Sequence, residues 1–145
     1  MDSIVVAEFR GLFWGEGSVL ITRKRLKGRG LWTYVPALTM DMYNDEREIL
    51  KAVALHIGGH FGGPYKISGA NDSFRYRWRV DGFTQTPPIA RLLLDGAVLP
   101  HPKIEQLGLL LEFCNYRLSF RHSYLGRKVK AKLAEYFERM KALRC

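Results

Sequence analysis

The stretch Arg10-Gly-Leu-Phe-Trp-Gly-Glu-Gly17 decides how the rest of this sequence is interpreted. It closes an almost uninterrupted apolar segment, Ile4 to Trp14, which predicts a helix that is buried on most of its sides. Gly15-Glu16-Gly17 is expected to end this helix, because glycine is the usual residue just past a helix C-terminus. One acidic side chain, Glu16, therefore stands in a glycine turn at the end of an apolar helix.

Two strands are predicted directly after this turn. Ser18 to Lys24 alternates imperfectly between apolar and polar residues, and Trp32 to Tyr43 alternates more clearly. In the second strand one face carries Pro36, Leu38, Met40 and Met42, and the other carries Val35, Ala37, Thr39, Asp41 and Tyr43. Proline has no N–H, so this strand is expected to lie at a sheet edge or to start irregularly. Residues 27–30 are predicted as a loop.

The second half of the chain repeats the pattern of helix and two strands and then becomes helical. A helix capped by Asn44 or Asp45 is predicted to run to about Ile57, where Gly58-Gly59 stops it. The remaining elements are a short strand at 65–68, a turn at 69–72, a strand at 73–80, and helices at 89–97, 103–117 and 125–143. The predicted fold is α+β in the order αββαββα with an additional C-terminal helix, as one domain over residues 1–145.

The strand Ser73 to Val80 carries an unusual run of positive charge. Arg75, Arg77 and Arg79 alternate with aromatic residues, so all three arginines project from one side of the strand. Like charges at this spacing repel unless something anionic covers them. An antiparallel sheet can enter the major groove of DNA, which predicts a nucleic-acid-binding face. Other residues expected on that face are Thr22, Lys24, Thr39, Asp41, Tyr43 and Lys66. A merely solvated sheet face remains the alternative.

Composition agrees with a polyanionic partner. The 145 residues carry a net charge of +9 and 47% apolar residues, which is enough for a core without disulfides. Cys114 and Cys145 are too few for a disulfide framework, and the four histidines lack metal-ligand spacing with them. No signal peptide or membrane-spanning run is recognised, so we expect a soluble, intracellular protein.

The stretch at residues 10–17 resembles the motif of the LAGLIDADG homing endonucleases. Gly11, Leu12, Gly15, Glu16 and Gly17 fall where that motif has its glycines, leucine and final acid, and Gly15-Glu16-Gly17-Ser18 is a known variant of its ending. The predicted element order matches the family across most of the chain. Trp14 departs from the pattern, because the motif commonly has an acidic or polar residue there.

The resemblance implies a sequence-specific, metal-dependent double-strand DNA endonuclease. Single-motif members of the family are homodimers, in which Gly11, Leu12 and Gly15 would let two motif helices approach closely. Glu16, with the carbonyl of Gly15, would hold Mg²⁺, for which Mn²⁺ could substitute. The target would be palindromic or nearly so. An intron-encoded or free-standing mobile element would be its genetic setting.

Three further residues are assigned by the same resemblance. Lys103 matches a lysine near the attacking water, and Asn44 and Arg47 match positions that hold solvent at the metal. Asn44 as a plain helix cap and Arg47 as a plain surface residue remain alternatives. Two other functions on the same fold stay open, namely a catalytically inactive DNA-binding regulator and a maturase that binds intron RNA.

Overall fold

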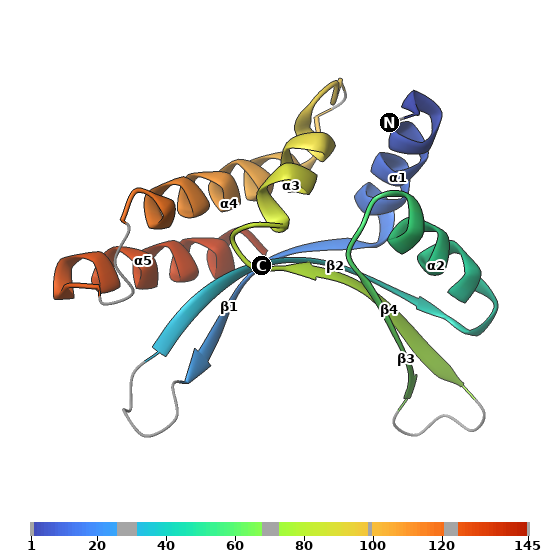
Figure 1. The fold of residues 1–145 in the computed structure, drawn as a ribbon, viewed down its shortest axis with the longest axis horizontal. Coiled ribbons are helices and arrows are strands. Elements are labelled where there is room, and N and C mark those ends of the chain that lie inside the picture. The colour runs from blue at the N-terminus through green and yellow to red at the C-terminus, as the bar shows by residue number, and fades with distance from the viewer. Residues whose placement is uncertain (1, 26–31, 68–72, 99, 121–124, 145) are drawn as a thin grey trace.

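One antiparallel sheet carries all the helices on one of its two sides (Figure 1). The computed structural model describes residues 2–25, 32–67, 73–98, 100–120 and 125–144. In these ranges the elements are α1 (Ser3–Glu16), β1 (Gly17–Arg25), β2 (Trp32–Tyr43), the 3₁₀ turn η1 (Asn44–Glu46), α2 (Arg47–His56), β3 (His60–Lys66), β4 (Phe74–Asp81), α3 (Thr86–Leu94), α4 (Pro102–Leu118) and α5 (Arg127–Arg144). The predicted order αββαββα with an additional C-terminal helix is confirmed.

The sheet is bent into an arch. Its strand order is β1-β2-β4-β3, so β1 and β3 are the edges and every neighbouring pair is antiparallel. The helices lie over the convex side, and the opposite side, called the concave face below, carries no helix among the described residues (Figure 1). A sheet with one covered and one open face requires strands that alternate between core and polar residues, as these strands do.

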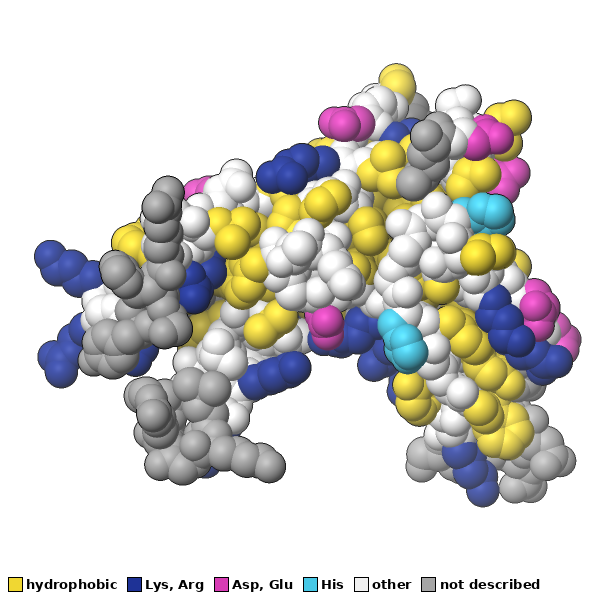
Figure 2. Space-filling model, viewed as in Figure 1, with side chains coloured by type: hydrophobic (Ala, Val, Ile, Leu, Met, Phe, Trp, Pro, Cys, Tyr) yellow, Lys and Arg dark blue, Asp and Glu magenta, His cyan; other side chains and the backbone are white. Residues whose placement is uncertain are grey.

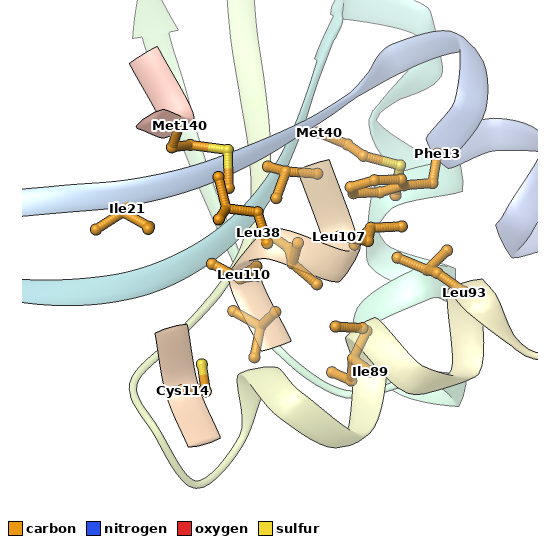
Figure 3. Close-up of a cluster of buried hydrophobic side chains, with 14 of the residues drawn as sticks. Phe13, Ile21, Leu38, Met40, Ile89, Leu93, Leu107, Leu110, Cys114 and Met140 are labelled. Atoms are coloured by element: carbon orange, nitrogen blue, oxygen red, sulfur yellow. The ribbon is translucent and has the colours of Figure 1, made fainter. Parts of the chain in front are cut away.

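The core fills the space between the convex side of the sheet and the helices (Figure 3). Leu38 and Met40 of β2 are fully buried there, together with Phe13 of α1, Leu93 of α3 and Leu110 of α4. Each such side chain stabilises the fold by about 1.5–3 kcal/mol relative to an exposed one. Elements from both ends of the chain therefore share one core, which fixes the end of α1 relative to the sheet and α4.

Several predicted boundaries need correction. Of the two alternatives predicted from Pro36, an edge strand or an irregular start, the edge is wrong because β2 is an interior strand. Its pairing with β4 begins only at the next residue, Ala37. β3 begins at His60, well before the predicted start at Tyr65, and its register shifts between Gly62 and Tyr65. The first half of this strand was not predicted because it contains glycine and proline, which are uncommon in strands. α3 begins at Thr86, with prolines in its first turn, and ends at Leu94.

The turn after α2 requires its glycine for a specific reason. Gly59 has a φ of 91°, and a Cβ added there would lie 2.6 Å from Nε1 of Trp78. That indole N–H donates a hydrogen bond of 2.7 Å to the carbonyl of Gly58. The buried tryptophan of β4 thus fastens the end of α2 to the sheet, and the predicted stop at Gly58-Gly59 is confirmed.

Burial of α1 differs from the prediction. Only one side of the helix is covered, by the fully buried Phe9 and Phe13, while Ile4 is 67% exposed and Gly11 and Gly15 also face outward. The C-terminal boundary is also later than expected, because α1 continues through Glu16 to a cap at Gly17. A helix that is apolar all round but covered on one side leaves an apolar surface open.

Some predictions fall on residues outside the described ranges. They are the loop at 27–30, the turn at 69–72, Ser68, His122 and Cys145, and for Asn44 only the backbone is described. Cys114 is buried, and burial raises the pKa of its thiol to about 12. None of the helices in the described ranges combines the length and apolar character that crossing a bilayer requires.

Candidate functional site

The C-terminal end of α1 is held by a lysine from α4. Nζ of Lys103 donates hydrogen bonds to the carbonyls of Phe13, at 3.0 Å, and of Trp14, at 2.6 Å. The carbonyls of the last helical turn lack N–H partners within the helix, so they can accept from outside it, as Phe13 also does from the cap Gly17. A cation near them also offsets the negative end of the helix dipole. Lys103 thereby fixes the last turn of α1, the turn that carries Gly15 and Glu16.

Lys103 and Glu16 interact electrostatically. Burial lowers the pKa of Lys103, and the negative charge of Glu16 opposes that shift by raising it. Glu16 itself is exposed at the junction of α1 and the edge strand β1. The structure thus brings together two of the residues predicted for the site, the acidic Glu16 and the basic Lys103, which are 87 residues apart in the sequence.

A ring stack sets the start of α4. The indole of Trp14 lies on the imidazole of His101, with ring centroids 5.2 Å apart and planes 24° from parallel. Nδ1 of His101 in turn accepts a hydrogen bond from the backbone N–H of Lys103 and caps α4. Sequence reasoning missed His101, because its partner Trp14 is 87 positions away in the chain and no local pattern joins them.

The concave face carries the predicted arginines. In the strand register Arg79 lies opposite Thr39, Arg77 opposite Asp41 and Arg75 opposite Tyr43, so all these side chains project to the same side. The register of β1 adds Ser18, Leu20, Thr22 and Lys24 to this face, and β3 adds His60 and Tyr65. Figure 2 shows Lys and Arg side chains on the underside of the arch, beside acidic and histidine side chains.

Two aspartates on the same face offset the repulsion between the arginines. Asp41 receives two hydrogen bonds from Arg77, from Nε at 2.7 Å and from Nη2 at 3.1 Å, and its Oδ2 lies 3.9 Å from Nη1 of Arg75. Arg79 donates from Nε to Asp81 at 3.0 Å. The hydrogen bonds that Arg77 donates to Asp41 raise the pKa of Arg77 against the opposing effect of burial. Asp81 continues the alternation of β4, so the sequence could have revealed it.

Lys66 is a correction to the predicted surface. It lies opposite Phe74, on the other side of the sheet from the arginines. The register shift between Gly62 and Tyr65 is the cause, because one extra residue in a strand exchanges the faces of all later side chains. Tyr65 takes the place expected for Lys66, with the guanidinium of Arg75 5.8 Å from its ring centre.

The other predicted residues vary in how well their positions suit the site. Thr22 points its hydroxyl at the carbonyl of Val35, 3.1 Å away, and Thr39 is 7% exposed. Lys24 and Tyr43 are exposed. Arg47 begins α2 and its Nε lies 3.6 Å from the carboxylate of Glu48. The side chain of Asn44 lies outside the described part of the structure, while its backbone begins η1 and the cap of α2 is Glu46.

The open side of α1 contains the residues expected at a dimer interface. Ile4, Gly11 and Gly15 form a stripe on the side of the helix opposite Phe13. A Cβ added at Gly11 or Gly15 would meet no atom within 4 Å. Leu12 lies beside this stripe and is partly buried in a groove of about 320 Å³ between α1 and α2. The stripe is therefore an accessible, apolar surface with two residues small enough for close helix contact.

The donor groups at the end of α1 suit a hard divalent cation. An exposed carboxylate and backbone carbonyls stand at the negative end of a helix dipole, and oxygen is the ligand that Mg²⁺ prefers. Among the described residues no three His, Cys, Asp or Glu side chains gather at one place. One chain therefore supplies one carboxylate, which is compatible with Mg²⁺ because this ion usually keeps several waters.

The arch of four strands with its helices on the convex side is the fold of the LAGLIDADG homing endonucleases. The homing endonuclease I-CvuI, solved in complex with the I-CreI target in 2 mM Mg with the DNA not cleaved, has a TM-score of 0.77 at 17% identity, over 97% of this chain and 82% of that one. The same endonuclease was also solved with its own target in 2 mM Ca.

This chain covers different shares of two further structures. The archaeal intron-encoded homing endonuclease I-Vdi141I, complexed with DNA, matches with a TM-score of 0.72 at 18% identity, over 99% of this chain and 86% of that one. The LAGLIDADG homing endonuclease I-GzeII, in complex with its DNA target, gives 0.69 at 17% identity, over 98% of this chain and 44% of that one. The sequence matches no protein-family model and no curated protein.

Proposed function

We propose that this chain is a sequence-specific double-strand DNA endonuclease that acts as a homodimer with Mg²⁺. The observation that carries the proposal is the junction of α1 and α4, where Lys103 fixes the helix turn that presents Glu16. The basic concave face favours DNA as the substrate. The fold, which this chain shares with endonucleases solved in complex with DNA, favours cleavage as the reaction.

Glu16 and the carbonyl of Gly15 would hold the metal ion. Bound there, Mg²⁺ would stabilise charge on the phosphate oxygens and make water a better nucleophile. The residues of the chain have their own tasks. Lys103 holds the carboxylate-bearing turn in place through two backbone carbonyls, and its positive charge lies near enough to Glu16 to attract anionic oxygens to the same spot. The concave face positions the duplex by contacts with its phosphates and bases.

Dimerisation follows from the number of acids and from the open stripe on α1. Two strands must be cut, and one chain has one Glu16. Pairing the stripes of Ile4, Gly11 and Gly15 from two copies would bring two such helix ends together and cover the exposed apolar surface. This chain spans most of I-Vdi141I but less than half of I-GzeII, as expected if the longer chain holds two such units.

Cleavage is tested by replacing the proposed metal ligand. Plasmid DNA with a randomised insert is incubated with the full chain and Mg²⁺, and the cut ends are sequenced to define the site. Glu16→Gln should lower the cleavage rate on the order of a thousandfold while DNA affinity in Ca²⁺ stays within about threefold. Cutting by Glu16→Gln at the normal rate would refute the role of Glu16. Specific binding without any cutting by the unmodified chain would indicate a regulator on this fold, and preferential binding of intron RNA a maturase.

The dimer is tested at a glycine. Gly11→Leu adds a side chain into open space, so the single chain should fold as before, and helix propensity even favours the change by up to about 1 kcal/mol. We expect a monomer in analytical ultracentrifugation and loss of double-strand cleavage. Gly108→Leu is the matched control, because Gly108 is also an exposed helical glycine with nothing within 4 Å. A dimeric Gly11→Leu protein would contradict this interface.

A further inference from the structure

The pair of Arg77 and Asp41 differs from the other charge pairs of the concave face. The two residues are direct cross-strand neighbours in the centre of the sheet, and both are about one-third exposed. Nε and Nη2 of Arg77 bond Oδ1 and Oδ2 of Asp41 in parallel, at 2.7 and 3.1 Å. Two parallel bonds fix the plane of the guanidinium as well as its position. Arg77 is therefore held in one orientation before any ligand binds.

The pairing occupies one edge of the guanidinium and leaves another edge for a ligand. Arginine has five N–H donors, of which Asp41 takes the Nε donor and one from Nη2. The edge formed by Nη1 and Nη2 is not engaged by Asp41. Two adjacent donors in one plane match two adjacent acceptors, and in the major groove guanine presents such a pair, O6 and N7. Among the described residues, this second edge of Arg77 thus has the geometry of a guanine contact.

Asp41 also decides what Arg77 avoids. A free arginine binds phosphate as readily as a base edge, because both offer acceptors and phosphate adds negative charge. With a carboxylate bonded to it, the pair has little net charge, and the carboxylate repels a phosphate brought close. The base edge carries no net charge and is not repelled in this way. Asp41 therefore shifts the preference of Arg77 from the backbone of DNA to its bases.

The neighbouring arginines lack this arrangement. Within the described part of the chain, Arg79 donates one hydrogen bond, to Asp81 two residues further along its own strand, where the carboxylate is 48% exposed. Arg75 lies 3.9 Å from Asp41, too far for a hydrogen bond. Neither guanidinium shows the paired bonds to one carboxylate that orient Arg77, so these two arginines suit phosphates or less selective base contacts. They provide an internal comparison for Arg77 on the same face.

We propose that Arg77, oriented by Asp41, reads one guanine in each half of the DNA target, and that Asp41 is a specificity-determining residue. This inference rests on the proposed function, since it assumes that the concave face receives duplex DNA. Beyond that function, the inference names the nucleobase that is read and the residue that reads it. It also gives a role to an acidic residue on a face proposed to bind a polyanion.

The experiment is a binding selection with the full chain in Ca²⁺, which should allow binding without cutting. A randomised duplex library is selected with the unmodified protein, Arg77→Lys and Asp41→Asn, and with Arg79→Lys and Asp81→Asn as the matched pair. Arg77→Lys keeps the charge but removes the planar fork. We expect one strongly guanine-enriched position per half-site, whose preference falls about tenfold or more in Arg77→Lys. The matched pair should leave that position unchanged.

Asp41→Asn separates orientation from mere attraction. It should lower the guanine preference at that same position and, at the same time, tighten binding to unrelated DNA and steepen its salt dependence by about one unit of slope. Circular dichroism melting checks that each variant is folded. An unchanged guanine preference in Arg77→Lys and Asp41→Asn, or weaker binding of Asp41→Asn to unrelated DNA, overturns the inference while the proposed function stands. If the unmodified protein enriches no site, both fail.

Discussion

Lys103 and Arg77 are two cations that the fold holds by different means. Lys103 lies on the convex side, bonded to the backbone carbonyls at the end of α1, and burial lowers its pKa. Arg77 lies on the concave face, bonded to the carboxylate of Asp41, which raises its pKa. Carbonyl dipoles hold a cation in place without a negative charge bonded to it, whereas a bonded carboxylate orients a cation and nearly cancels its charge.

The difference suits two separate tasks. A cation with no carboxylate bonded to it can act on developing negative charge during a reaction, where a neutral pair could contribute little. A neutral, oriented pair can discriminate between bases, where an uncompensated charge would be drawn to any phosphate. Replacing either cation should therefore damage one property and spare the other.

Of the changes that test this difference between the two cations, Lys103→Met should have the largest effect, and the effect is on cleavage. The variant loses both bonds to α1 and the charge near Glu16, so the single-turnover cleavage rate should fall by about a hundredfold or more, while affinity for the selected target in Ca²⁺ changes by less than about threefold. Lys51→Met, in an exposed pair with Glu48, is the control and should cleave normally. A Lys103→Met protein that cuts normally but binds poorly would reverse the comparison.

A second effect concerns the titration of Lys103. Its pKa should be lower than that of an ordinary lysine, and Glu16→Gln should lower it further, because the charge of Glu16 raises it. The measurement is an NMR titration of the lysine side-chain resonances in the two proteins. A rise of the Lys103 pKa on Glu16→Gln would contradict the electrostatic link between the two residues.

The lowered pKa of Lys103 also makes the stability of the fold depend on pH. Because the folded chain releases the Lys103 proton at lower pH than the unfolded chain, the unfolded state binds more protons between the two pKa values. The contribution of Lys103 to the free energy of unfolding therefore rises with pH across that window. Urea titrations over this pH range should show that the free energy of unfolding of the unmodified protein, minus that of Lys103→Met, increases as the pH rises.

The smallest effect is expected at Trp14. Trp14→Leu removes the stack on His101 that sets the start of α4, so Lys103 loses part of its positioning. The cleavage rate should fall by about three- to tenfold, the equivalent of one aromatic contact. Trp14→Phe retains an aromatic ring and should recover most of the rate in the same single-turnover assay. A loss as large as that of Lys103→Met would instead indicate a direct role for Trp14.

Sequence reasoning was accurate where a structural feature depends on residues close together in the chain. The bounds of β2 are those predicted, and Leu38, Met40 and Met42 lie in the core as their spacing indicated. The shared face of the three arginines followed from alternation alone. The motif at residues 10–17 and its acid at the end of a helix were also visible in the sequence.

The tertiary structure decided what depends on the pairing of distant segments. The bulge in β3 placed Lys66 on the opposite face and Tyr65 beside Arg75, because a single extra residue exchanges the faces of a strand. The register of β2 against β4 made Asp41 the partner of Arg77. The side of α1 left open was set by where the sheet and α3 cover it.

The end of α1 shows the same division. The sequence by itself determined that one acid closes an apolar helix, because helix periodicity and glycine ends are local properties. Only the tertiary structure decided that Lys103 bonds that helix end and that Trp14 and His101 stack behind it. Their contacts join positions almost ninety residues apart, and such contacts depend on how the whole core packs, which no short pattern of residues encodes.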